Sequence, residues 1–325
     1  MAIDYLKRLE PYKGMFSVEI ITALYSALTF IAIVLLWGAL DNPLHMLGGR
    51  LLIVAVMAAL MMVYRRFPCK ATAFMRVAFQ LALLSYWYPD TYEFNKLLPN
   101  LDHLFASAEQ TIFGAQPAYW FSKECPQTWI SELLNMGYFA YYPMIATIVI
   151  WNFLFNFKIF EKTAFVLEVS FFVLYIVYIL VPVAGPQFYF PVIGDDSVLS
   201  GVFPAVGDYF RYHPELLPSA DTGEGFFYGL VEHSQAVGER PTAAFPSSHV
   251  GISTIIMIMA WRNSRRLFAV MLPFYVLLCC ATVYIQAHYL IDVFAGLASA
   301  AILYVVSTKV YKRWFNKPDL LRRWL

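Results

Sequence analysis

The stretch that decides the fold reads FPSSHVGISTIIMIMAW, residues 245–261, where a polar Pro-Ser-Ser-His turn leads into an apolar run. Further apolar runs lie on both sides of it along the chain. A helix needs about 20 apolar residues to cross the hydrocarbon core of a bilayer. The sequence therefore predicts an all-α, polytopic membrane helix bundle with spans near residues 16–37, 47–64, 72–88, 130–155, 163–183, 246–261, 267–286 and 289–308.

The composition supports this fold class and excludes others. Of 325 residues, 60% are hydrophobic and only 14% are charged, whereas a soluble domain has about 25% charged residues. The formal net charge of +1 argues against a protein that binds nucleic acid. The four cysteines, Cys69, Cys125, Cys279 and Cys280, form neither a disulfide framework nor a CxxC metal motif.

Lysine and arginine residues predict the orientation of the spans. With a cytoplasmic N-terminus, all but five of the 23 Lys and Arg residues fall in or beside cytoplasmic segments, as the positive-inside rule requires. We therefore expect both termini to be cytoplasmic, and residues 89–129 and 185–245 to form long outer segments. The N-terminal sequence MAIDYLKRLEPYKG lacks the apolar stretch of a signal peptide. The chain also has no Asn-x-Ser/Thr site, which favours a bacterial inner membrane over a secretory pathway.

The first candidate site lies at the mouth of the span that begins at Pro246. Ser247 or Ser248 can cap this helix, and the free N–H groups at a helix N-terminus favour an anion such as phosphate. His249 follows directly, at the outer end of the span. The alternative is that Pro-Ser-Ser serves only as a cap and that His249 is an ordinary interfacial side chain.

The second candidate site reads QAHYLIDVFAG, residues 286–296. His288 and Asp292 are four residues apart and therefore share one face of a helix. That helix begins at the same outer surface as the span that carries His249. A carboxylate next to one ring nitrogen fixes the tautomer of a histidine and leaves its other nitrogen free to act as a nucleophile or base. The alternative is a purely structural His–Asp pair.

Together these two motifs resemble those of the type 2 phosphatidic acid phosphatase superfamily, which includes lipid phosphate phosphatases and lipid phosphotransferases. Residues 245–251 are similar to its Pro-Ser-x-His motif, and His288 with Asp292 is similar to the end of its third motif. The resemblance implies a six-helix core over residues 71–325, with outer loops 89–129 and 185–245. Residues 1–70 would then add the cytoplasmic stub and two accessory transmembrane helices.

The resemblance also implies a mechanism. His288 would attack phosphorus to form a phosphohistidine, while Asp292 holds its ring. His249 would protonate the departing alcohol and then deprotonate the acceptor. This chemistry needs no metal and no other cofactor.

Two departures favour the transferase branch of this superfamily. Residues 181–191, VPVAGPQFYFP, contain none of the basic residues that the phosphatase branch has there, and Ala281 and Thr282 replace its Ser-Arg pair. A Gly-Pro at residues 185–186 together with two histidines and an aspartate is more similar to inositol phosphorylceramide synthases. Arg240, with Ser247 and Ser248, is then the best candidate for holding phosphate, unless it is only a solvated loop charge; Arg211, Gln187 and Tyr189 are weaker candidates for substrate contact.

The sequence thus favours a membrane phosphotransferase that moves a phospho-headgroup, such as phosphoinositol, from a phospholipid to a lipid alcohol such as ceramide. Its partners would be membrane lipids and not nucleic acid. The first alternative is a lipid or polyprenyl phosphate phosphatase of the same fold. The second is a proton-coupled transporter that uses His288 and Asp292 as a relay. The sequence shows no repeated halves of the kind common in transporters, and it places these residues at the outer boundary instead of the midplane.

Overall fold

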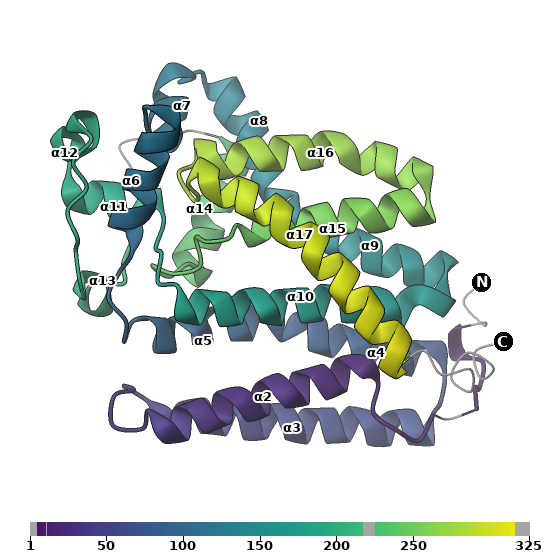
Figure 1. The fold of residues 1–325 in the computed structure, drawn as a ribbon. Coiled ribbons are helices and arrows are strands. Elements are labelled where there is room, and N and C mark those ends of the chain that lie inside the picture. Colours follow the sequence, from purple (N-terminus) through teal and green to yellow (C-terminus); the bar gives the residue numbers. More distant parts are fainter. Residues whose placement is uncertain (1–4, 11, 217–224, 316–325) are drawn as a thin grey trace. The chain divides into compact units, whose positions relative to one another are not determined.

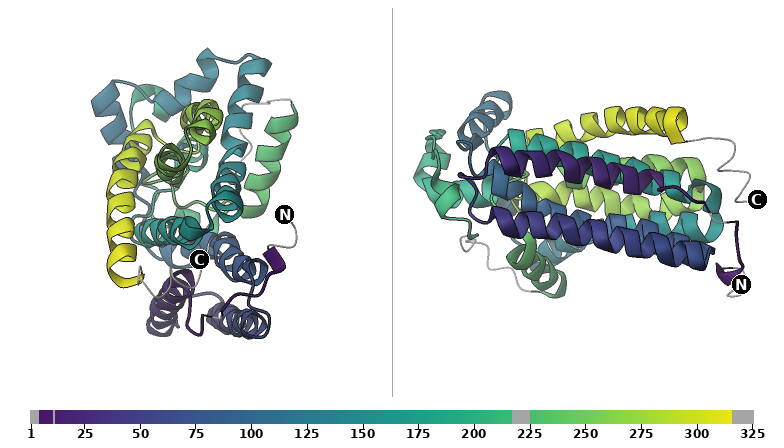
Figure 2. Two further views of the ribbon diagram at one scale, coloured as in Figure 1. Left: turned by 90° about the vertical axis from the view of Figure 1, so that its right-hand side faces the viewer. Right: turned by 90° about the horizontal axis from the view of Figure 1, so that it is seen from below.

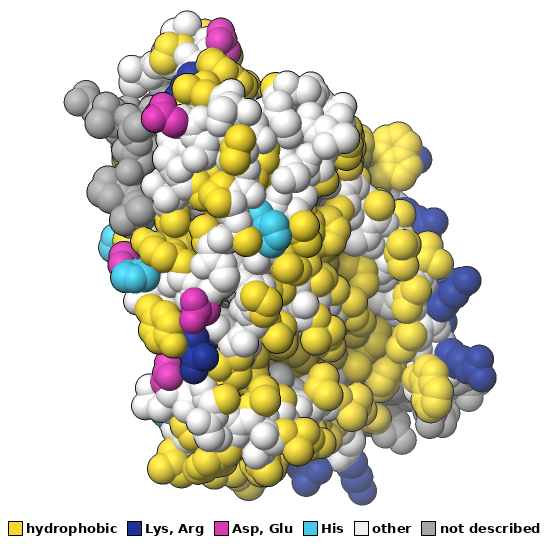
Figure 3. All heavy atoms as spheres, turned by 60° about the vertical axis from the view of Figure 1, so that its left-hand side comes forward, with side chains coloured by type: hydrophobic (Ala, Val, Ile, Leu, Met, Phe, Trp, Pro, Cys, Tyr) yellow, Lys and Arg dark blue, Asp and Glu magenta, His cyan; other side chains and the backbone are white. Residues whose placement is uncertain are grey.

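The computed structural model describes residues 5–10, 12–216 and 225–315, and every regular element in these residues is a helix (Figure 1). Six helical segments are long and apolar enough to cross a membrane: Ser17–Leu35, Pro43–Arg66, Thr128–Phe155, Phe157–Leu180, Arg265–Tyr284 and Leu290–Phe315. Apolar side chains such as Leu51, Val54 and Leu180 are exposed on them, and hydrophobic atoms cover much of the face seen in Figure 3. These features confirm the predicted all-α, multi-pass membrane bundle.

Two of the eight expected spans are not among these six segments. The expected span 72–88 corresponds to two helices, α4 (Lys70–Ala82) and α5 (Leu84–Asn95), which are divided at Leu83. The expected span 246–261 corresponds to α15 (Ser248–Asn263), which has only 16 residues. Helix α15 ends at Asn263, two residues beyond the expected span, because Ser264 begins the next helix at once, its Oγ accepting a hydrogen bond from Leu267 N at 3.3 Å.

The chain forms two compact units. Unit 1 comprises residues 1–90, 149–172 and 303–325, and unit 2 comprises residues 91–148 and 173–302. In unit 1, α2 (Ser17–Leu35) packs against α3 (Pro43–Arg66) and against α4. Helices α2 and α3 run side by side (Figure 2).

Unit 2 contains both long segments that the sequence predicts to lie outside the membrane, and both fold into short helices. Residues 89–129 contain the end of α5 followed by α6 (Asp102–Phe113) and α7 (Pro117–Glu124). In residues 185–245, the described part forms α11 (Pro186–Ile193), α12 (Asp195–Ser200), α13 (Tyr209–Tyr212) and α14 (Phe226–Gly238).

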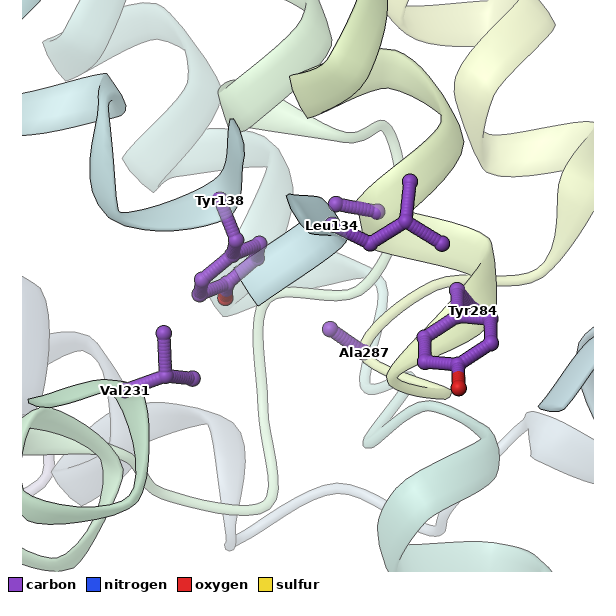
Figure 4. Close-up of a cluster of buried hydrophobic side chains, with 6 residues drawn as sticks. Leu134, Tyr138, Val231, Tyr284 and Ala287 are labelled. Atoms are coloured by element: carbon purple, nitrogen blue, oxygen red, sulfur yellow. The ribbon is translucent and has the colours of Figure 1, made fainter. Parts of the chain in front are cut away.

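The long helices of unit 2 pack around α16 (Arg265–Tyr284). It lies against α15 and against α8 (Thr128–Phe139), while α14 packs on α8. Buried side chains join these helices in one apolar cluster: Leu134, Tyr138, Val231, Ala281, Tyr284 and Ala287 (Figure 4). The remaining helices, α9 (Tyr141–Phe155), α10 (Phe160–Leu180) and α17 (Leu290–Val310), each extend through both units.

Candidate active site

His249 is placed by the cap of α15. Ser247 is the N-cap residue, and its Oγ accepts a hydrogen bond from the amide of Val250 at 3.3 Å. Its own amide donates to the carbonyl of Asp292 at 3.1 Å. The start of α15 is therefore tied to the start of α17, and His249 is held in the first turn of its helix.

A close contact between two glycines sets the spacing of these two helices. A Cβ atom on Gly296 of α17 would lie 2.7 Å from the carbonyl oxygen of Ser247, and one on Gly251 would lie 3.3 Å from the carbonyl oxygen of Gly296. Real Cβ atoms do not come as close as the first of these distances, so only glycine fits at residue 296. This contact holds the turn that carries His249 against the turn that follows His288.

Replacing Gly296 by Ala is therefore expected to separate α15 from α17. Overpacking of this kind typically costs about 1–3 kcal/mol, and we expect a lower thermal midpoint together with a loss of most activity in the purified variant. Gly229 of α14 is the matched control, because an added Cβ there meets no atom within 4 Å. Wild-type activity in the Gly296→Ala variant would contradict the proposed role of this contact.

His288 lies in the connection between α16 and α17. Its amide donates to the carbonyl of Thr282 at 3.0 Å, and Gln286, two positions earlier, has a left-handed φ of 61°. The ring Nδ1 lies 2.8 Å from the carbonyl oxygen of Ala244. A carbonyl oxygen can only accept, so Nδ1 carries the proton and Nε2 keeps a lone pair.

The two histidine rings meet through the nitrogens that phosphoryl transfer would need. His249 Nδ1 lies 3.3 Å from His288 Nε2, although the residues are 39 positions apart in the chain. Because His288 Nε2 is the acceptor, the proton between the rings belongs to His249 Nδ1. A lone pair on one ring thus faces a proton donor on the other.

The surroundings hold His249 firmly and keep His288 neutral. The His249 ring stacks on Tyr138 at a centroid distance of 4.5 Å and contacts Tyr141 at 4.4 Å. Burial lowers the pKa of His288 to about 4, although the Ala244 carbonyl and the nearby Glu239 carboxyl act in the opposite direction. At neutral pH the lone pair on His288 Nε2 is therefore available for attack.

Asp292 lies near His288 but binds the backbone instead of the ring. Its Oδ2 is 3.8 Å from His288 Nδ1, which is too far for a hydrogen bond. The same oxygen accepts a hydrogen bond from the amide of Tyr289 at 2.8 Å, and Oδ1 has no hydrogen-bond partner among the described residues. Asp292 thus caps α17, while the Ala244 carbonyl fixes the tautomer of His288.

Two acids of α6 organise the same region, and the sequence analysis did not single them out. Asp102 is fully buried and accepts hydrogen bonds from the amides of Ala184 and Gly185, at 2.7 and 2.8 Å, and from the hydroxyl of Tyr289 at 2.9 Å. Glu109 accepts a hydrogen bond from the amide of Leu290 at 3.0 Å. Burial raises the pKa of Asp102, and it raises that of Glu109 to about 8.

A sequence signal for these acids does exist. Asp102 and Glu109 are seven residues apart, which is two helical turns and places them on one face of α6. The residues of α6 belong to the segment 89–129, which the sequence predicts as an outer segment without assigning a role to its acids. Together they connect α6 to both residues that follow His288.

Gly185 completes the arrangement around His288. It has a φ of 96°, a conformation that suits glycine, and an added Cβ would lie 2.8 Å from the carbonyl oxygen of Ala287. The amide of Ala244 donates to the carbonyl of Val183 at 3.0 Å. The Gly-Pro turn therefore brings together the three segments that hold the His288 ring.

The other predicted site residues lie around this centre with partners of their own. The Arg240 guanidinium donates to the carbonyl of Glu239 at 2.8 Å, and Arg211 lines a small cavity with Lys96 and Pro241. Gln187 Oε1 accepts a hydrogen bond from the Gln235 side chain at 3.1 Å. Ser248 and Tyr189 are buried; the carbonyl of Ser248 lies 3.5 Å from the Tyr141 hydroxyl, and the Tyr189 hydroxyl donates to the carbonyl of Pro204 at 2.7 Å.

Comparison with known protein families finds a match for most of unit 2 and part of unit 1. The family model described as the PAP2 superfamily matches residues 104–306, which run from α6 to α17 and include both histidines. Comparisons with curated proteins and with solved structures find no match.

Proposed function

The chain belongs to the PAP2 superfamily, and we propose that it is an integral membrane phosphotransferase acting on lipids. Membership supports an enzyme of the lipid phosphatase or phosphotransferase type. The observation that carries the finer proposal is the contact between His249 Nδ1 and His288 Nε2, with His288 Nδ1 held by the Ala244 carbonyl. This contact places a nucleophile, His288 Nε2, next to a proton donor, His249 Nδ1.

In the proposed reaction, His288 Nε2 attacks the phosphorus of a phospholipid. The bond between phosphorus and the diacylglycerol oxygen breaks, and His249, protonated on both ring nitrogens for this step, gives one proton to that oxygen and becomes neutral as diacylglycerol is released. The headgroup phosphate is then bonded to His288. A lipid alcohol such as ceramide next gives its hydroxyl proton to His249 while its oxygen attacks phosphorus, and the P–N bond breaks to restore the enzyme. General acid–base catalysis of this kind typically increases the reaction rate by about 10²–10⁴-fold.

Arg240, Ser247 and Ser248 remain our candidates for holding the phosphate oxygens, and Asp292 for orienting His288 through the start of α17. Arg211, Gln187 and Tyr189 remain weaker candidates for substrate contact. The domain division into residues 1–70 and 71–325 also remains a proposal. So does the location of the site on the periplasmic face of a bacterial inner membrane with cytoplasmic termini, which the distribution of Lys and Arg supports.

Helix α14 supports a lipid alcohol over water as the acceptor. Its first turn is bound by Glu132 of α8, whose carboxylate accepts hydrogen bonds from the amides of Phe227 and Tyr228 at 3.1 and 2.8 Å. Val231 then packs in the cluster that contains Tyr138, the residue stacked on His249 (Figure 4). The apolar first half of α14 is thus held against the residues that flank the two histidines, Tyr138 and Ala287, where it is suited to keep water from a phosphohistidine.

The test is to follow the products. Purified full-length protein is given a phosphoinositide and ceramide in mixed micelles, and radiolabelled phosphorus is traced in the lipid and aqueous phases. We expect a sphingolipid that carries the phospho-headgroup, with diacylglycerol released in equal amount, and continued release beyond one diacylglycerol per enzyme only when ceramide is present. Release of water-soluble phosphate or phospho-headgroup without a labelled sphingolipid would favour the phosphatase alternative.

A further inference from the structure

A line of buried polar side chains follows α2 of unit 1, away from the two histidines in the sequence. Glu19, Thr22, Ser26 and Thr29 are all buried, at intervals that place them on one side of the helix. Helix α2 is one of the six candidate membrane spans. Polar and ionisable groups are costly within a bilayer and commonly mark a functional path there.

Both ends of this line are neutralised by buried ion pairs. At one end, Glu19 accepts two hydrogen bonds from the Arg76 guanidinium, at 2.7 and 2.5 Å. At the other, Arg50 donates to the Thr29 hydroxyl at 3.1 Å and pairs with Asp90 at 2.7 Å. These pairs need no further partner to account for their burial.

The middle of the line is different, because its polar atoms are not satisfied. Glu168 of α10 is fully buried; its Oε1 accepts a hydrogen bond from the Thr22 hydroxyl, and its Oε2 has no partner among the described residues. Gln80 of α4 is also fully buried, and neither its Oε1 nor its Nε2 has a partner in the described part of the chain. The Oγ of Ser26 is also buried and has no hydrogen-bond partner among the described residues.

These groups lie at one level of unit 1. Thr22 is about one turn beyond Glu19 on α2, and Gln80 is about one turn beyond Arg76 on α4. The Glu19–Arg76 pair joins α2 to α4, and Tyr25 of α2 contacts Trp87 of α5, the helix that follows α4, with ring centroids 5.1 Å apart. Helices α2 and α4 therefore run in the same direction, and we infer that Gln80 lies near the level of Thr22, the residue that binds Glu168.

We propose that Glu168, Gln80, Ser26 and Thr22 form a binding site for a monovalent cation, either a proton or Na⁺. No Lys or Arg among the described residues forms an ion pair with Glu168, so its carboxylate charge calls for a bound cation or proton. The unsatisfied oxygens are carboxylate, amide and hydroxyl oxygens, which are the ligands that hard cations prefer.

The test compares the wild-type full-length protein with Glu168→Gln and with the control Glu161→Gln. Glu161 lies on the same helix, but its Oε1 already accepts hydrogen bonds from the amide and the hydroxyl of Ser17, both at 2.7 Å. Thermal unfolding of purified protein is followed as Na⁺ replaces choline at constant ionic strength. In parallel, infrared spectra between pH 5 and pH 9 report any protonated carboxyl group that titrates.

A thermal midpoint that rises by several °C with Na⁺ in the wild type and in Glu161→Gln, but not in Glu168→Gln, identifies Na⁺. A titrating carboxyl band that only Glu168→Gln lacks, without an Na⁺ effect, identifies the proton. Absence of both signals in the folded wild-type protein would overturn the proposal. If Glu168→Gln does not fold, Gln80→Met removes an oxygen at similar volume; a response identical to wild type in both measurements would also overturn it.

Discussion

Replacing His288 by Asn is expected to lower the rate of phosphoryl transfer by about 10⁴-fold or more, the scale of loss when an enzyme loses its nucleophile. Asn offers no nitrogen lone pair at the position of His288 Nε2, so no covalent intermediate can form. Its amide can still donate toward the Ala244 carbonyl, which His288 Nδ1 approaches to 2.8 Å in the wild type. The loss is therefore expected to come from chemistry more than from folding.

The measurement is a rapid quench of wild-type and variant protein with a donor labelled at phosphorus. Wild-type protein is expected to carry a label that is lost in acid and stable in alkali, as a phosphohistidine is, and the variant is expected to carry none. Thermal unfolding of the variant provides the control for folding. A labelled His288→Asn protein, or one with normal turnover, would exclude His288 as the nucleophile.

The sequence predicts both histidines but not the group that orients the second one. His249 and His288 are recognisable because each stands in a short motif beside an apolar run. The partner of His288 Nδ1 is a backbone carbonyl, that of Ala244, and any residue type can supply a carbonyl. Its position depends on the turn at Gly185 and on the bond from Ala244 N to Val183 O, which join segments about 60 residues apart.

For Asp292, the sequence predicts the neighbouring side chain but not the hydrogen-bond partner. Four-residue spacing predicts that its carboxylate faces His288, and the two side chains do lie on one side at 3.8 Å. The spacing does not reveal that α17 begins at Leu290, which leaves the amide of Tyr289 without a helical partner. The carboxylate of Asp292 binds that amide at 2.8 Å. A local backbone donor thus competes with the ring for the same oxygen.

The number of spans was harder to predict than the fold class. Apolar composition identifies six of the eight segments, but it does not show where a helix stops. The stop of α15 depends on a single residue, Ser264, which ends that helix and caps α16. Likewise, no proline or glycine lies next to Leu83, so the sequence does not indicate that α4 and α5 are divided there.

The second large effect concerns the proton on His249. Replacing His249 by Gln is expected to lower kcat/KM for a natural phospholipid donor by about 10²–10⁴-fold, because the departing alcohol would leave as an alkoxide without its proton. A second donor carries the same headgroup phosphate on p-nitrophenol. Its leaving group, p-nitrophenolate, is a stable anion at neutral pH and needs no proton. For that donor the same variant is expected to lose much less of its activity.

The difference between the two donors separates an acid–base role from a positioning role. Loss of packing against Tyr138 and Tyr141 would misplace the nucleophile and slow both donors equally. Loss of the proton slows only the donor whose leaving group needs one.

His233, exposed on α14, supplies the matched His→Gln control. His249 Nδ1 is the donor in the 3.3 Å contact with His288 Nε2, so it lies beside the proposed nucleophile. Equal losses for both donors would therefore mean that the proton comes from another group and that His249 acts through packing alone.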